Sequence, residues 1–224
     1  MSIAQLIDHT ILKPTTTLAE IEKLCAEAAQ YGFATVCVPP YFVAAAKRFL
    51  DVSNGVGVAT VIGFPFGYSA ITAKAAEVQE AIDNGADELD MVINLAAVKA
   101  QDWDYLKKEI ETVSALSSKS GKTLKLIIES GILTDDEIIK CCEIYQQYPV
   151  QFLKTSTGYA ERGASVEAVQ LMRQHLPSNI QIKASGGIKT LSFAQQLVQA
   201  GATRLGCSAS IAIVKDEKGT EGGY

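Results

Sequence analysis

Short apolar runs alternate with longer amphipathic segments along the chain, and this alternation predicts its secondary structure. Each apolar run has the length of a strand buried on both faces, and each amphipathic segment repeats its apolar positions at helical spacing. The predicted strands are Ile7–Thr10, Phe33–Val38, Gly57–Ile62, Glu88–Ile93, Leu124–Glu129, Val150–Lys154, Ile180–Lys183 and Thr203–Gly206. The predicted helices are a short one before Ile7, then Leu18–Ala29, Phe42–Leu50, Thr72–Asn84, one within Trp103–Ser117, Thr134–Tyr145, Val166–His175 and Leu191–Ala200.

Capping signals mark the first residues of two of these helices. Thr17 precedes the first long helix and Glu20 follows it three residues later, which is the pattern of a capping box. Thr134 and Glu137 repeat that pattern. Gly32 is expected to end the first long helix, because glycine readily adopts the left-handed conformation that terminates many helices.

About eight strand–helix units follow one another without a linker, a low-complexity segment or a change in composition. Such alternation produces a parallel sheet with right-handed crossovers, and eight units favour closure into a TIM (β/α)8 barrel. The rival is an open flavodoxin-like or Rossmann sheet, but those folds use fewer strands and no GxGxxG motif follows the first strand here. We therefore predict a single TIM-barrel domain over residues 1–224, with a short N-terminal helix and a flexible tail over about 216–224.

Composition and charge narrow the range of partners. The net charge is −5, from 20 Lys+Arg against 25 Asp+Glu, and no basic cluster stands out, so no nucleic-acid partner is expected. No apolar run reaches the roughly 18 residues of a membrane span. The first five residues lack the basic start and apolar core of a signal peptide, so no membrane association is predicted.

The cysteines indicate the cellular compartment, and the cysteines and histidines together bear on metal binding. Five cysteines are an odd number and contain no CxxC pair, which favours reduced thiols in a cytoplasmic protein over a disulfide framework or a zinc site. The two histidines are far apart in the sequence, which argues against a multi-histidine metal site. We expect neither a metal nor a cofactor.

Two predicted strands end in lysine. Lys154 is followed by Thr155-Ser156-Thr157-Gly158, whose hydroxyl groups and glycine suit an anionic or sugar-like ligand. Lys183 is likewise followed by small residues. One such lysine alone is more simply explained as a side chain that reaches out of the sheet into solvent. Two of them at matching strand ends indicate a site, since a buried ammonium is unfavourable unless it is paired or neutralised.

In a TIM barrel the site lies at the carboxyl ends of the strands, so Lys154, Lys183 and Asp90 can meet there although they are distant in sequence. Two lysines in a dry pocket disfavour each other's charge, and burial disfavours it further, which leaves one amine partly neutral and nucleophilic near pH 7. Such an amine forms a Schiff base with an aldehyde, and the other lysine and Asp90 can relay protons. A simple salt bridge to a lysine on a neighbouring strand explains Asp90 equally well.

Glycines follow the last two predicted strands. Gly186-Gly187-Ile188 and Gly206-Cys207-Ser208 are each expected to open a helix. Barrels often bind phosphate at these two loops, because glycine lets backbone N–H groups approach an anion and helix N-termini favour one. Either loop alone is compatible with an ordinary turn, and the two together predict a phosphate site.

With these residues in view, the chain resembles the deoxyribose-phosphate aldolases of the short, bacterial type over nearly its whole length. The resemblance rests on IDHTILKP at 7–14, VCV at 36–38, VIGFP at 61–65, GADELDMVIN at 85–94, FLKTSTG at 152–158 and KASGGI at 183–188, of which the fourth and fifth are the most specific. It implies a metal-free class I aldolase on a TIM barrel that reversibly cleaves 2-deoxy-D-ribose 5-phosphate to D-glyceraldehyde 3-phosphate and acetaldehyde. It also implies a homodimer or homotetramer and a role in deoxyribonucleoside catabolism.

The resemblance assigns roles to individual residues. Lys154 matches the Schiff-base lysine, Lys183 the lysine that perturbs it, and Asp90 the aspartate of the proton relay. Tyr224 matches a C-terminal tyrosine that assists proton transfer in some members, and a plain disordered terminus is an equal alternative. The substrate-binding positions that it implies are Thr10, Cys37, Thr155, Gly158, Gly186, Gly187, Gly206 and Ser208.

The chain also departs from the family pattern near these positions. Pro39 stands where asparagine is usual, Tyr159 where some members have a lysine near the phosphate, and Ala209 where a second serine is common. These departures bear on how tightly a phosphate is held and leave the reaction class unchanged. Two other functions stay open: another phosphate-binding barrel enzyme, such as a flavin-dependent oxidoreductase or a ketose-phosphate aldolase, and a non-enzymatic sugar-phosphate-binding protein.

Overall fold

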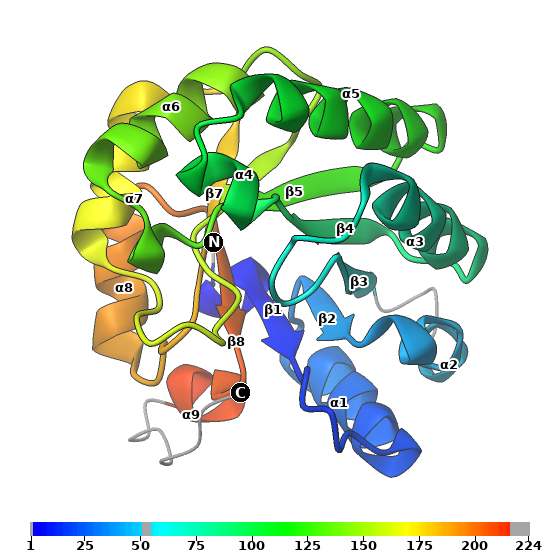
Figure 1. The fold of residues 1–224 in the computed structure, drawn as a ribbon. Helices are drawn as coiled ribbons and strands as arrows, with labels where there is room; N and C mark the ends of the chain where they lie inside the picture. The colour runs from blue at the N-terminus through cyan, green and yellow to red at the C-terminus, as the bar shows by residue number, and fades with distance from the viewer. Residues whose placement is uncertain (1, 51–54, 216–224) are drawn as a thin grey trace.

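The structure is a computed structural model that describes residues 2–50 and 55–215. Within them, parallel strands form a closed barrel in the order β1 to β8, and helices surround it (Figure 1). The strands are β1 Ile7–Thr10, β2 Thr35–Val38, β3 Gly57–Ile62, β4 Glu88–Val92, β5 Thr123–Ile127, β6 Phe152–Lys154, β7 Gln181–Ser185 and β8 Arg204–Cys207. The predicted TIM barrel is confirmed and the open sheet is excluded. The predicted tail and Tyr224 lie outside the described residues.

The helices follow the predicted units closely. They are α1 Leu18–Tyr31, α2 Val43–Phe49, α3 Ile71–Asp83, α4 Leu95–Lys99, α5 Trp103–Lys119, α6 Asp135–Tyr145, α7 Val166–His175, α8 Leu191–Ala200 and α9 Ser210–Val214, with 3₁₀ helices η1 Ile3–Leu6, η2 Pro40–Phe42 and η4 Ser130–Ile132. The predicted N-terminal helix is η1. Both capping boxes form, and Gly32 ends α1 at φ +67°.

Three expectations near the predicted site were wrong. Strand β7 continues two residues beyond Lys183, because Ala184 and Ser185 still pair with β8. The loop at Gly186 and Gly187 does not open a helix, because α8 begins at Leu191, its predicted first residue, after the N-cap Thr190. Gly206 and Cys207 belong to β8, and the five-residue helix α9 begins at Ser210.

The strands separate two cores. Residues on the outer face of the barrel, such as Ile7, Leu89 and Leu126, pack with the surrounding helices into the main hydrophobic cluster. Inside the barrel a small apolar cluster made of Leu12, Cys37, Ala59 and Val61, with Phe64 packed against it, comes from the β1, β2 and β3 side. The outer core holds the barrel together, since the hydrophobic effect scales with the apolar area removed from water.

Two further features concern compartment and membrane. All five cysteines are buried and unpaired. No described helix has both the length and the apolar character needed to cross a bilayer.

Candidate active site

The rest of the barrel interior contains a network of charged side chains. Ion pairs link residues of strands that are not neighbours, such as β4 and β7, so these side chains cross the inside of the barrel. Four cations and three carboxylates take part, and they come from six strands. They are Asp8, Glu88, Asp90, Lys125, Lys154, Lys183 and Arg204.

Asp90 lies at the centre of this network. Its Oδ2 accepts hydrogen bonds from Lys154 Nζ at 2.8 Å and from Lys183 Nζ at 2.6 Å. Its Oδ1 accepts one from Lys125 Nζ at 2.6 Å. The structure thus brings together the three residues predicted from sequence, and it adds Lys125 as a third amine.

The other amines form ion pairs with further carboxylates, whereas the ion pair to Asp90 is the only one that Lys154 forms in the described part of the chain; Glu129 interacts with Lys154 electrostatically without an ion pair. Lys183 also pairs with Asp8, and Lys125 contacts Glu88 at 2.5 Å. Lys154 pairs only with Asp90, which it shares with the two other lysines. It is therefore the amine whose charge is least compensated.

The pKa shifts follow from this arrangement. Burial lowers the pKa of Lys154; Asp90 works against that effect, and the charge of Lys183 adds to it. Burial alone would also lower the pKa of Lys183, but the carboxylates of Asp8 and Asp90 raise it well above its usual value. Burial would raise the pKa of Asp90, but the surrounding ammonium groups hold it well below its usual range. An amine with a lowered pKa thus lies beside an amine with a raised pKa.

The count of charges also indicates that Lys154 is the amine whose protonated form is least favourable. With every group ionised, four cations face three carboxylates, which leaves one positive charge in excess. Loss of one proton from Lys154 balances the network. Because an uncompensated charge in a buried site is unfavourable, this deprotonation is the least costly adjustment.

At the amino ends of the strands, the network includes residues that contact one another across the barrel. Glu88, Phe152 and Arg204 are the first residues of β4, β6 and β8. Arg204 pairs with Asp8 at 2.7 Å and Glu88 at 2.9 Å, and its guanidinium lies 5.3 Å from the centre of the Phe152 ring. These side chains fill the layer of the barrel that lies opposite the carboxyl ends of the strands.

Lys154 borders the inner apolar cluster. Cys37 is close enough to interact electrostatically with both Lys154 and Lys183, and burial raises the pKa of its thiol. Thr10 pairs with Cys37 in the register of β1 and β2 and donates its hydroxyl to the carbonyl of Asp8 at 2.8 Å. Both predicted pocket residues therefore line the barrel interior near the amines.

The predicted phosphate-binding positions divide into two groups. Gly158, Gly186 and Gly187 have left-handed φ angles of +89°, +87° and +75°. A Cβ on Gly186 would lie 3.0 Å from the Cα of Gly163 and 3.4 Å from that of Gly158, so the loops after β6 and β7 approach through bare backbone. Thr155 lies beside them, but its hydroxyl is bonded to the main chain of Ser185.

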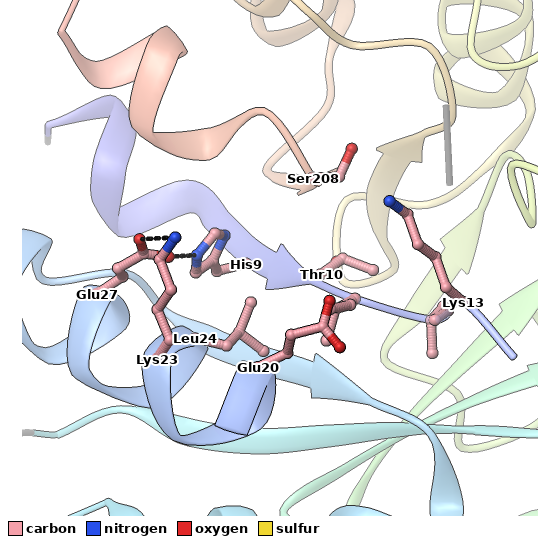
Figure 2. A pocket seen from close by; sticks show the side chains of 10 residues that line it. His9, Thr10, Lys13, Glu20, Lys23, Leu24, Glu27 and Ser208 are labelled. Atoms are coloured by element: carbon pink, nitrogen blue, oxygen red, sulfur yellow. Dashed lines mark hydrogen bonds and ion pairs between the residues drawn. The ribbon is translucent and has the colours of Figure 1, made fainter. Parts of the chain in front are cut away.

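Gly206 and Ser208 lie elsewhere. Gly206 is inside β8, where a Cβ would lie 2.8 Å from Cβ of Ser185 and 3.1 Å from Cε of Lys183, so its bare backbone makes room for the Lys183 stem. Ser208 is exposed and lines a cavity of about 220 Å³ beside the end of β1, together with Thr10 and Lys13 (Figure 2). In the same cavity Glu27 accepts a hydrogen bond from His9 at 3.0 Å.

Sequence reasoning missed several charged residues of the site. Asp8, Lys125, Glu88 and Arg204 were not singled out. The signal for Lys125 was available: it stands between Leu124 and Leu126 in a strand, so it faces the opposite side from both. Within residues 2–50 and 55–215 no three His, Cys, Asp or Glu side chains are grouped so that they could hold a metal ion.

Known proteins resemble this chain in sequence and fold. The family described as DeoC/LacD family aldolase matches residues 2–215. A deoxyribose-phosphate aldolase from Thermoanaerobacter sp. is 48% identical over 217 residues, which are 96% of this chain and 97% of that protein. The solved structure of QR15, an aldolase, has a TM-score of 0.90 at 37% identity and covers 95% of this chain and 94% of its own. A deoxyribose phosphate aldolase from Aeropyrum pernix, described as a unique tetramer, has a TM-score of 0.87 at 28% identity and covers 95% and 89%.

Proposed function

The chain belongs to the DeoC/LacD family of aldolases, lyases that break a carbon–carbon bond and release an aldehyde; from this premise we propose that it reversibly cleaves 2-deoxy-D-ribose 5-phosphate through a Schiff base on Lys154. One observation carries the proposal. Lys154 is the buried amine that shares its only carboxylate with two other cations, and its pKa is lowered. A neutral amine beside charged neighbours is the nucleophile that this chemistry requires.

The first step joins the sugar to the protein. The lone pair of Lys154 Nζ adds to C1 of the open-chain sugar, the C1 oxygen takes up one proton from Lys183 and one from the attacking nitrogen and leaves as water, and a C=N bond forms that carries one positive charge. Asp90, whose Oδ2 is 2.8 Å from this nitrogen, remains ionised and stabilises the cation.

The second step breaks the C2–C3 bond. A base takes the proton of the C3 hydroxyl, and the C2–C3 electron pair moves towards the cationic nitrogen. D-Glyceraldehyde 3-phosphate leaves and an enamine stays on Lys154. Protonation of the enamine at C2 and addition of water to C1 then release acetaldehyde and restore the amine.

We assign the proton transfers to Asp90 and Lys183. The two groups are 2.6 Å apart, and both adjoin Lys154 in the network. Lys183 has a second role, because its positive charge lowers the pKa of Lys154. Tyr224, outside the described residues, is proposed to assist these transfers, which the rate of a Tyr224→Phe variant would test.

The remaining assignments concern binding and assembly. We propose that the phosphate binds to backbone N–H groups near Gly158, Gly186 and Gly187, supported by the left-handed φ angles of all three and by the close approach of Gly158 and Gly186. Thr10, Cys37, Thr155 and Ser208 are proposed to line or support the substrate pocket, and Gly206 to leave room for Lys183.

The larger context is also a proposal. A single domain, a homodimer or homotetramer, a cytoplasmic location and a role in deoxyribonucleoside catabolism fit the reaction. The tetrameric description of the Aeropyrum pernix relative supports the assembly, and the buried, unpaired thiols support the compartment.

A substrate comparison and a trapping experiment test the proposal. The purified protein should release glyceraldehyde 3-phosphate from deoxyribose 5-phosphate and leave fructose 1,6-bisphosphate intact. Incubation with acetaldehyde and cyanoborohydride should place an ethyl group on Lys154, as located by peptide mass spectrometry, with Lys154→Met as the control. Cleavage of the bisphosphate alone, or a Lys154 that stays unmodified while exposed lysines are ethylated, would contradict the proposal.

A further inference from the structure

The chain contains a strained residue between β5 and η4. Glu129 has φ +53° and ψ +55°, a left-handed conformation that residues other than glycine rarely adopt. The N–H of Ile128 donates to the carbonyl of Lys154 at 3.0 Å. The N–H of Ser130 donates to that of Thr155, the very next residue, at 2.7 Å. Glu129 is therefore an extra residue in the pairing, a position that glycine would occupy without strain.

The side chain of Glu129 is buried and bound to the loop after β6. It is 3% exposed, and its carboxylate accepts hydrogen bonds from the N–H of Thr157, at 3.2 and 3.3 Å to the two oxygens, and from the Thr157 hydroxyl. Burial raises the pKa of Glu129, whereas the hydrogen bonds from Thr157 and the charge of Lys154 lower it. The contacts with Thr157 thus offset part of the cost of burying this carboxylate.

Thr157 in turn holds Gly158. The Thr157 hydroxyl oxygen accepts a hydrogen bond from the N–H of Tyr159 at 3.0 Å, so the turn closes around Gly158, which has φ +89°. The N–H groups of Thr157 and Tyr159 both have acceptors, whereas that of Gly158 donates to no group in the described part of the chain. Gly158 is partly exposed and Thr157 is buried. The N–H of Gly158 is therefore available to a ligand.

We propose that Glu129 is a positioning residue for the phosphate of the substrate: through Thr157 it holds the N–H of Gly158 in place as a phosphate donor. The inference rests on the proposed function, which places the phosphate near Gly158, Gly186 and Gly187. A Cβ on Gly186 would lie only 3.4 Å from Cα of Gly158, so a displaced Gly158 would also disturb the neighbouring loop. Glu129 itself touches no reacting atom in this account. Its removal should weaken phosphate binding and leave imine formation on Lys154 intact.

Two substrates that differ only in the phosphate test the inference. The ratio of kcat/KM for deoxyribose 5-phosphate to kcat/KM for 2-deoxy-D-ribose would be measured in the unaltered protein and in Glu129→Gly and Glu129→Gln variants. This ratio does not depend on the fraction of folded protein, so a loss of stability alone leaves it unchanged. We expect it to fall about 10-fold or more in Glu129→Gly, since a hydrogen bond to a charged group contributes roughly that factor. Glu129→Gln keeps one acceptor oxygen and should lose less.

A matched control separates the side chain of Glu129 from its backbone conformation. Glycine keeps the left-handed turn at this position without strain and removes only the carboxylate side chain. Gln101, between α4 and α5, is the one other non-glycine residue in the described part of the chain with a positive φ, at +56°, and it is exposed. Gln101→Gly should leave the ratio unchanged.

Variants of Thr157 test the same contact from its other side. Thr157→Val removes the hydroxyl that donates to Glu129 and accepts from the N–H of Tyr159, so the ratio should fall. Thr157→Ser retains a hydroxyl and should restore the ratio. A ratio that falls equally in Thr157→Ser and Thr157→Val would show that the hydroxyl does not position Gly158.

Trapping of acetaldehyde on Lys154 with cyanoborohydride separates the two proposals. If the unaltered protein forms no adduct on Lys154, the proposed function fails. If the adduct forms but the unaltered protein does not prefer the phosphorylated sugar, Glu129 has no phosphate to position. If the preference exists and stays unchanged in Glu129→Gly, or in Thr157→Val should Glu129→Gly not fold, Glu129 does not position the phosphate.

Discussion

Among residues 2–50 and 55–215, buried lysines lie in two places, and the two differ in how their charges are matched. Outside the barrel, Lys74 on α3 pairs with Glu109 on α5 at 2.7 Å, and both side chains are almost fully buried. Lys74 also donates to the carbonyl of Val92 at 2.7 Å, and Glu109 accepts from the N–H of Asn94 at 3.1 Å. One cation therefore meets one carboxylate, and the backbone satisfies the rest. Inside the barrel, three lysines share one aspartate.

Burial alone does not create a reactive amine. Burial lowers the pKa of Lys74 as it lowers that of Lys154. Lys74, however, has a carboxylate of its own and no free space: a Cβ on Gly63 would lie 2.7 Å from its Cε. Lys154 shares its carboxylate and interacts with Cys37 of the inner apolar cluster. The sharing of one carboxylate by three amines distinguishes the proposed site from a structural ion pair.

The largest difference in kcat is expected between a variant that lacks Lys154 and a variant that lacks Lys74. Lys154→Met should lower kcat on deoxyribose 5-phosphate by on the order of 10⁴-fold or more, because loss of a covalent nucleophile removes the whole pathway. Lys74→Met, assayed at a temperature where it remains folded, should stay within about 10-fold of the unaltered protein because Lys74 does not touch the site. Comparable losses of kcat in the two variants would contradict the assignment of a catalytic role to Lys154 and a structural role to Lys74.

A second prediction concerns the charge balance. Lys183→Met leaves three cations against three carboxylates while Lys154 is still protonated, so the pKa of Lys154 should rise. A smaller neutral fraction then exists at each pH, so the acidic limb of kcat/KM against pH should move to higher pH. The rate at pH 7 should fall by about 10²–10³-fold, the usual size of an acid–base contribution.

Lys183→Arg is the matched variant for this prediction. It keeps the positive charge, so the acidic limb should stay near its original pH, but a guanidinium does not release a proton and the rate should still be low. An acidic limb that stays in place in Lys183→Met would show that Lys183 does not set the pKa of Lys154.

The smallest effect on activity is expected from changes to the ion pair of Lys74 and Glu109. The same changes should have a large effect on stability. Lys74→Met leaves the Glu109 carboxylate buried without a partner, which should reduce the free energy of unfolding by about 3–5 kcal/mol. The double variant Lys74→Met/Glu109→Gln should recover most of that loss, because no buried charge is left unpaired. Urea unfolding measures both values, and equal losses in the single and double variants would contradict this account.

The sequence predicted the barrel because each unit is locally consistent. The strand Gly57–Ile62 and the helix Val166–His175 were predicted with the bounds observed, since apolar runs and helical spacing agree with the capping residues there. Helix α4 was missed because its five residues are too few to show a helical period. Its N-cap Asn94, whose side chain accepts from Ala97 N–H, was the only local signal.

The site was predicted less completely than the fold. Lys154, Lys183 and Asp90 stood out because small residues or a recognisable motif accompany them. Which groups each amine contacts depends on the register of eight strands, and no local pattern gives that register. Tyr159 was noted only as a departure from a pattern, since its contacts with Leu12 and Phe64 join loops from opposite sides of the barrel.

Glu88, Phe152 and Arg204 contact one another at the amino ends of the strands, so we expect reactants to reach Lys154 from the carboxyl ends. If the proposed reaction runs in the synthetic direction, both reactants then use the same route. We expect acetaldehyde to bind to Lys154 first, because a partner that entered before it would obstruct that route. Initial-rate kinetics should therefore show a compulsory order of addition, with inhibition by an excess of the second reactant.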